Sequence, residues 1–122
     1  MSEHLSVSYA KDQSADRHGD RAAAIEAAQK ALSADFVHLP TVLREVTRAV
    51  HAQGYAEACA MFVEHAETMT VEKAFASLVR THGLEASRTT NPSDTLHDSE
   101  YRNGRQRAIN DLLGFVFNIP KY

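Results

Sequence analysis

The stretch Glu100–Phe117, EYRNGRQRAINDLLGFVF, contains an Asn-Gly pair, three arginines and then a dense apolar run. At about 100° per residue, Tyr101, Arg105 and five apolar residues fall within a sector of about 120°. The five are Ala108, Ile109, Leu112, Phe115 and Val116. We predict one continuous helix, because Asn-Gly signals a hairpin only between alternating apolar strands. A helix that begins after Gly104, with Asn103 as its cap, is the alternative.

Gly104 lies beside the apolar stripe of this predicted helix. Glycine in a helix interior costs about 1 kcal/mol relative to alanine, and it allows another backbone or a binding partner to approach closely. We therefore predict a partner-binding surface formed by Tyr101, Arg102, Gly104, Arg105 and Phe117. An ordinary helix end with surface charge is the alternative. We predict no catalytic, cofactor-binding or metal-binding residue.

Two amphipathic segments occupy the middle of the chain, over residues 39–54 and 55–67. Pro40 fits the first turn of the first segment, and Gly54 is a typical helix stop. Apolar residues recur in this segment at helical spacing, namely at Leu39, Val42, Leu43, Val46 and Val50. The sequence therefore predicts that this stripe faces the core.

Residues 70–83 have the clearest helical pattern, with Thr70 as the expected cap and Gly83 as the expected stop. Residues 84–98 have no hydrophobic period and are rich in Ser, Thr, Asn, Asp and Pro. This composition is typical of a loop. We therefore predict a loop between residues 70–83 and the last helix.

The N-terminal residues 1–19 are mostly polar, with one short alternating patch, LSVSYA. We predict a flexible arm here, because a single short strand is not stable in water. Asp20 is a good N-cap for an alanine-rich helix. The whole pattern predicts an all-α fold, a single-domain bundle of four to five amphipathic helices over residues 20–122 with a flexible N-terminal arm over residues 1–19.

The composition of the 122 residues is ordinary for a globular protein, with 43% hydrophobic and 24% charged residues and a net charge of -3. Because the net charge is negative, we do not expect a nucleic-acid partner. The only cysteine, Cys59, excludes an intrachain disulfide, and its apolar neighbours indicate a buried position. An apolar run near 18 residues and a signal-peptide pattern are both missing, so we expect a cytoplasmic protein that spans no membrane.

Two other function classes stay open as alternatives. One is a nucleic-acid-binding regulator with a helix-turn-helix-like element. Its candidate recognition helix, YAEACAMFVEHAE, carries three glutamates and no lysine or arginine, which counts against this class. A small histidine-using enzyme or metal protein is the other. The chain has seven histidines, and no two of them are three or four residues apart. A metal site such as His51 with His65 and Glu64 would form only if the tertiary structure brought these side chains together.

The segment NGRQRAINDLLGFV resembles a Gly-Arg and Leu-Leu segment that recurs in small helical proteins encoded by tailed bacteriophages. The matching positions are Gly104, Arg105, Leu112 and Leu113. Some proteins of that group are virion-associated, so the resemblance implies a phage-encoded accessory protein in the host cytoplasm or the virion. We therefore expect a non-enzymatic protein without cofactors, which binds a protein partner or copies of itself.

Overall fold

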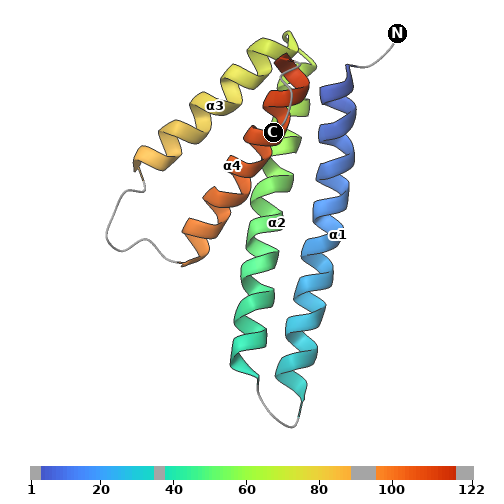
Figure 1. The fold of residues 1–122 in the computed structure, drawn as a ribbon, viewed down its shortest axis with the longest axis vertical. Helices are drawn as coiled ribbons and strands as arrows, with labels where there is room; N and C mark the ends of the chain where they lie inside the picture. The colour runs from blue at the N-terminus through green and yellow to red at the C-terminus, as the bar shows by residue number, and fades with distance from the viewer. Residues whose placement is uncertain (1–3, 35–37, 89–95, 118–122) are drawn as a thin grey trace.

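The computed structural model describes residues 4–34, 38–88 and 96–117, without the side chains of residues 84–88 and 96–98. The described residues form four helices and no strand, which confirms the all-α prediction. The helices are α1 (Leu5–Ser33), α2 (Leu39–Ala66), α3 (Val71–Arg88) and α4 (Leu96–Phe117). Figure 1 shows α1 and α2 side by side as a long antiparallel hairpin, with α3 and α4 packed toward one end of it.

Helix α1 begins at Leu5, so the predicted flexible arm over residues 1–19 is wrong from that residue onward. His4 caps the helix, because its Nδ1 accepts the backbone N–H of Ser6 at 3.1 Å. Asp20, the predicted cap, lies inside the helix instead. The buried residues of α1 are small: Ser6, Ala10, Ala24 and Ala28. A stripe of alanine and serine gives almost no hydrophobic period, which is why the sequence pattern missed it.

Helix α2 runs through Gly54 without a break and ends at Ala66, so the two segments predicted over 39–54 and 55–67 are one helix. Pro40 occupies the first turn, as predicted. Helix α3 likewise passes Gly83 and extends to Arg88. Glycine therefore ends neither helix. The predicted loop over residues 84–98 is helical at both of its ends, and its central residues 89–95 lie outside the described residues.

Two other predictions about helix ends are confirmed. Thr70 precedes α3, and its Oγ1 accepts the backbone N–H of Lys73 at 3.3 Å. Helix α4 is continuous through Asn103 and Gly104 and ends at Phe117. The Asn-Gly pair is therefore part of a helix and not a turn.

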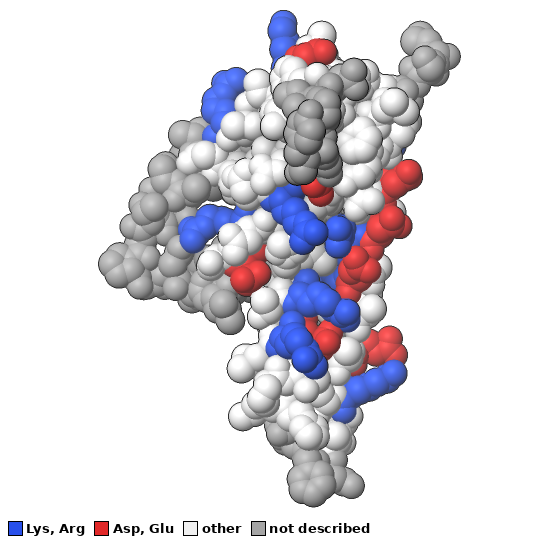
Figure 2. All heavy atoms as spheres, in the orientation of Figure 1, with Lys and Arg blue, Asp and Glu red and all other residues white. Residues whose placement is uncertain are grey.

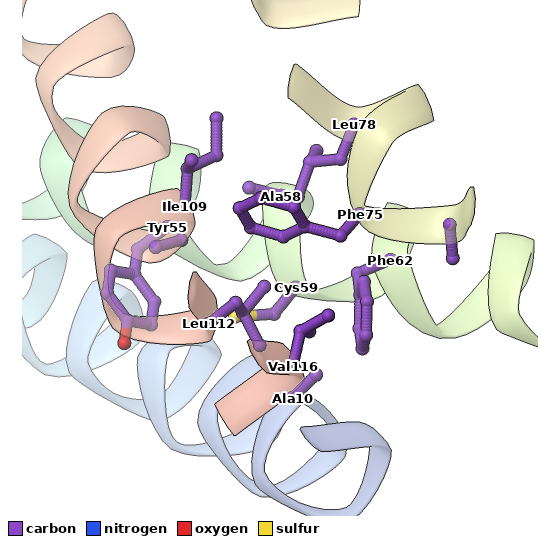
Figure 3. Packing of buried hydrophobic residues seen from close by; sticks show 12 residues of the cluster. Ala10, Tyr55, Ala58, Cys59, Phe62, Phe75, Leu78, Ile109, Leu112 and Val116 are labelled. Carbon is purple, nitrogen blue, oxygen red and sulfur yellow. The ribbon is translucent and has the colours of Figure 1, made fainter. Parts of the chain in front are cut away.

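The hydrophobic core lies where all four helices meet (Figure 3). Its members come from every helix and include the predicted apolar residues of α4 except Phe115. They are Ala10, Tyr55, Ala58, Cys59, Phe62, Ala74, Phe75, Leu78, Ala108, Ile109, Leu112 and Val116. The predicted burial of Cys59 is confirmed.

Among the described residues, only α1 and α2 form the other end of the hairpin (Figure 1). We call residues 21–33 of α1 and 39–53 of α2 the stem. A two-helix hairpin has only one mutual interface and leaves the remaining apolar side chains of each helix open to solvent. In the part of the chain that the structure describes, the stem therefore lacks a second layer of helices over most of its length, and α4 contacts it near His51.

Candidate functional site

Helices α2 and α4 cross at two glycines that bring the backbones into direct contact. A Cβ atom built on Gly104 would collide with the carbonyl oxygen of His51 and would lie 3.1 Å from the backbone nitrogen of Tyr55. A Cβ atom on Gly54 would collide in turn with the carbonyl oxygen of Tyr101. Gly54 lies three residues after His51 in α2, and Gly104 lies three residues after Tyr101 in α4, so the crossing is reciprocal. The close approach predicted at Gly104 therefore occurs within this chain.

The other residues of the predicted partner-binding surface lie around this crossing. Arg105 is only 3% exposed, and its guanidinium lies 5.6 Å from the centre of the Tyr101 ring. Arg102 is half-buried. Phe117 is 46% exposed, and its ring meets the edge of Phe75 at 5.6 Å between centroids. The structure thus brings Tyr101, Gly104 and Arg105 together and places Phe117 apart at the other end of α4.

A buried polar cluster joins α1, α2 and α4 beside the core. The Tyr55 hydroxyl donates to Asp111 Oδ2 at 2.6 Å and forms a second hydrogen bond with the Tyr9 hydroxyl at 2.8 Å. The guanidinium of Arg17 lies over the Tyr55 ring, 4.5 Å from its centre, within the range of a cation–π contact. Tyr55 is fully buried, so these bonds satisfy a hydroxyl that would otherwise be costly to desolvate.

Tyr55 of this cluster and the neighbouring Cys59 are held in their neutral forms. Burial raises the pKa of Tyr55, and its hydrogen bonds to Asp111 and Tyr9 raise it further. Burial also raises the pKa of the neighbouring Cys59 thiol, to about 12, with Arg17 opposing and Asp111 reinforcing the shift. A thiol acts as a nucleophile only as the thiolate. The cluster is therefore suited to fixing the packing of three helices and unsuited to nucleophilic chemistry.

His51 forms the second polar contact between α2 and α4. Its Nδ1 lies 3.8 Å from Glu100 Oε2, next to the glycine crossing. Burial lowers the pKa of His51, Glu100 raises it, and Arg107 and Arg17 lower it. Burial is the largest of these causes, so the net direction is downward. The neutral imidazole is therefore favoured over the charged one in the folded chain.

The described residues offer no metal centre. Among them, no three His, Cys, Asp or Glu side chains are grouped closely enough to hold an ion. His51 and His65 are both on α2, fourteen residues apart, which separates them by about 21 Å along the helix axis. Within the described ranges, no helix combines the length and the apolar character that crossing a membrane requires.

The stem has an apolar groove between α1 and α2 with a volume of about 280 Å³. At its end far from the α1–α2 connection, Arg21 Nε donates to Gln53 Oε1 at 3.2 Å, and both side chains line the groove. Gln29 is its third polar residue. Its remaining lining is apolar: Ile25, Ala28, Leu32, Val42, Val46, Ala49 and Val50.

Large apolar side chains remain exposed around this groove. The stripe predicted to face the core is buried at Val50 but uncovered toward the connection, where Leu39 is 60% exposed, Leu43 59% and Val46 46%. On α1, Leu32 is 54% exposed. Figure 2 shows the corresponding end of the hairpin as a mostly uncharged surface, while acidic side chains follow the α1 edge and basic ones gather over the middle.

The sequence pattern identified the stem stripe but assigned it to the core. A signal in the sequence could have shown otherwise, because the stem part of α1 offers only Ile25 and Leu32 as large apolar residues opposite five on α2. Two side chains cannot cover five. The surplus apolar surface therefore had to be either exposed or covered by something outside the hairpin.

Comparison with known proteins leaves the chain without an assigned group. No protein-family model, no curated protein and no solved structure matches it.

Proposed function

We propose that this chain is a non-enzymatic assembly protein that acts through protein–protein contact, with the stem as its main contact surface. The observation that carries the proposal is the row of exposed leucine and valine side chains along α2 in the stem. A contiguous apolar patch exposed on a protein surface usually marks an interface. A phage-encoded role in virion assembly, which the resemblance of the Gly104–Leu113 segment implies, is part of the same proposal.

The core end of the molecule supports this proposal because its functional groups are buried within the chain. The Tyr55 hydroxyl is hydrogen-bonded to Asp111 and Tyr9, and Tyr55 and Cys59 are both buried and neutral. Gly104 and Arg105 are buried within the chain. We therefore place the main contact surface on the stem and keep Phe117, which is half-exposed at the end of α4, as a secondary contact.

Site-specific photocrosslinking tests the proposal. A photoreactive amino acid at Leu43 should form adducts with a protein, either another copy or a different chain, in the extract of the native source. The matched control carries the same group at Val79, an exposed apolar residue of α3 that is 41% exposed. Adduct yield at position 43 that does not exceed the yield at position 79 would refute the stem as the contact surface.

A further inference from the structure

We propose that four arginines on α1, α2 and α4 form a surface that binds an acidic segment of another protein. The four are Arg17, Arg44, Arg48 and Arg107, and we call them the arginine band. Their guanidinium groups would hold the carboxylates of the segment, because the planar guanidinium matches the geometry of a carboxylate with paired N–H donors. The arginine band is separate from the apolar row of the stem, so this proposal goes beyond the proposed function and does not depend on it.

Helical spacing aligns the band along one side of α2. One face of the helix carries residues separated by four, three and four positions, namely Arg44, Arg48, His51 and Tyr55. At about 100° per residue, Arg44 and Arg48 lie at least about 100° around the helix from Leu43 of the apolar row. The face from Arg44 to Tyr55 is about 16 Å long, which is about three turns of helix.

The arginines of the other two helices converge on the same face. Arg17 of α1 stands over the Tyr55 ring, with its guanidinium 4.5 Å from the ring centre. Burial is the main reason that the pKa of His51 is lowered, and the charges of Arg107 and Arg17 add to this effect. Both guanidinium groups therefore lie near the imidazole. Figure 2 shows basic side chains gathered over the middle of the molecule, in agreement with this convergence.

Two arginines of the band carry charge that no carboxylate among the described residues contacts. Arg44 and Arg107 are both exposed, and neither forms an ion pair within the described ranges. They belong to different helices, so a ligand that pairs with both must lie across the band. These two guanidinium groups are therefore available to carboxylates from outside the chain.

The carboxylates near the other members of the band have partners of their own. Glu45 Oε2 lies 2.7 Å from Arg48, and Asp20 Oδ2 lies 3.4 Å from Arg17. Glu100 lies 3.8 Å from the imidazole of α2. A guanidinium has five N–H donors, so one carboxylate partner leaves further donors available. Arg48 and Arg17 can therefore contribute to binding while they remain paired.

The acidic edge of α1 favours a narrow partner. Asp12, Asp16 and Asp20 are exposed and four residues apart, so they follow one edge of the helix. Figure 2 shows acidic side chains along this edge, next to the basic side chains in the middle. Duplex DNA carries about one negative charge per 1.7 Å of its axis, spread over two strands, and this edge would repel it. A single acidic segment can lie on the band alone, so we expect protein carboxylates and not nucleic-acid phosphates.

Fluorescence anisotropy of a labelled oligoglutamate peptide, with the intact chain as titrant, tests the proposal. A peptide of about ten residues is long enough, because it spans about 15 Å as a helix. The wild-type chain should bind the peptide at about 0.01 M salt, and about 0.5 M salt should weaken binding about tenfold or more, because salt screens exposed charges. Binding that salt does not weaken would contradict the role of the arginines.

A pair of double variants locates the binding surface. Arg44→Gln combined with Arg107→Gln should weaken binding about tenfold or more, because it removes the two charges that no described carboxylate contacts. The matched control is Lys73→Gln combined with Arg80→Gln on α3, which removes as much positive charge and leaves the band intact. All four positions are exposed, so circular dichroism should show unchanged helicity in both double variants.

A wild-type chain that does not bind oligoglutamate at low salt would overturn the proposal, and so would equal weakening by the two double variants. Single-stranded DNA of similar length is the competing ligand. If it bound more tightly than oligoglutamate and lost this binding in the Arg44 and Arg107 double variant, an acidic protein segment would be the wrong partner. None of these results bears on photocrosslinking at position 43, so this proposal and the proposed function can fail separately.

Discussion

Replacing Gly104 by alanine tests the reciprocal crossing of α2 and α4 with a single methyl group. A Cβ atom at this position collides with the His51 carbonyl oxygen and lies 3.0 Å from the carbonyl carbon, closer than nearly all real Cβ contacts. The atoms that it meets belong to the backbone of α2. No side-chain rotation can relieve the collision, so the two helices must separate.

The expected cost follows from two opposing terms. Overpacking of a well-packed interior costs about 1–3 kcal/mol, and a collision with rigid backbone belongs at about 3 kcal/mol, the upper end of that range. Alanine gains back about 1 kcal/mol through its better helix propensity. We therefore expect Gly104→Ala to lower the free energy of unfolding by about 2 kcal/mol, which corresponds to a fall in Tm of roughly 8 °C for a domain of this size.

Urea unfolding followed by circular dichroism measures this difference, and Gly19→Ala is the matched control. Gly19 also lies inside a helix, but nothing stands within 4 Å of the position of its Cβ. Gly19→Ala should therefore stabilise the chain by up to about 1 kcal/mol. If Gly104→Ala stabilised the chain as much as the control, the close crossing of α2 and α4 would be refuted.

Three further predictions concern the buried polar groups. In urea unfolding, Tyr55→Phe should lower the free energy of unfolding by about 2 kcal/mol, because two hydrogen bonds are lost. Tyr9→Phe loses one hydrogen bond and should cost about half as much. Equal costs for the two variants would contradict the central position of Tyr55. Cys59 should react with a thiol reagent at about pH 8 at least tenfold more slowly in the native chain than in denaturant, because its pKa is raised to about 12; equal rates would show an accessible thiolate. Folding lowers the pKa of His51, so its contribution to stability is complete above its unfolded pKa of 6.5 and is lost as the pH falls below that value. Glu100→Gln should make this loss of stability larger, and His51→Gln should reduce it. The measurement is the urea midpoint of each variant at about pH 7.5 and about pH 5. A midpoint that rises on acidification in the wild type but not in His51→Gln would contradict the direction of the pKa shift.

The sequence predicted the parts of the fold whose signals are local. The apolar stripe of α4, the Thr70 cap and Pro40 in the first turn of α2 were all readable, because each depends on residues within one or two turns. The extent of α1 was not, because its buried side is made of alanine and serine. Its N-terminal half packs against residues such as Tyr55, which lies 46 positions after Tyr9 in the chain.

The two glycines of the crossing illustrate the same limit. Gly54 has the sequence pattern of a helix stop, and only the position of the Tyr101 backbone shows that the glycine makes room for a crossing helix. The exposure of the candidate site on the stem also depends on tertiary structure. Leu39 and Leu43 form a regular helical stripe in the sequence, and nothing local shows that no other helix covers them.

The separation of the core end from the stem also divides the molecule by local stability. Backbone amides near Tyr55 and Phe62 lie among all four helices, whereas amides near Leu32 and Leu43 belong to a hairpin supported on one side only. Regions with fewer buried contacts open at lower free energy than the global unfolding. Hydrogen exchange of the monomer should therefore be fastest at the stem end of the hairpin and slowest around Phe62. Binding at the stem would slow exchange where it is fastest, so the part of the chain that most easily loses its structure is also the part that a partner would stabilise most.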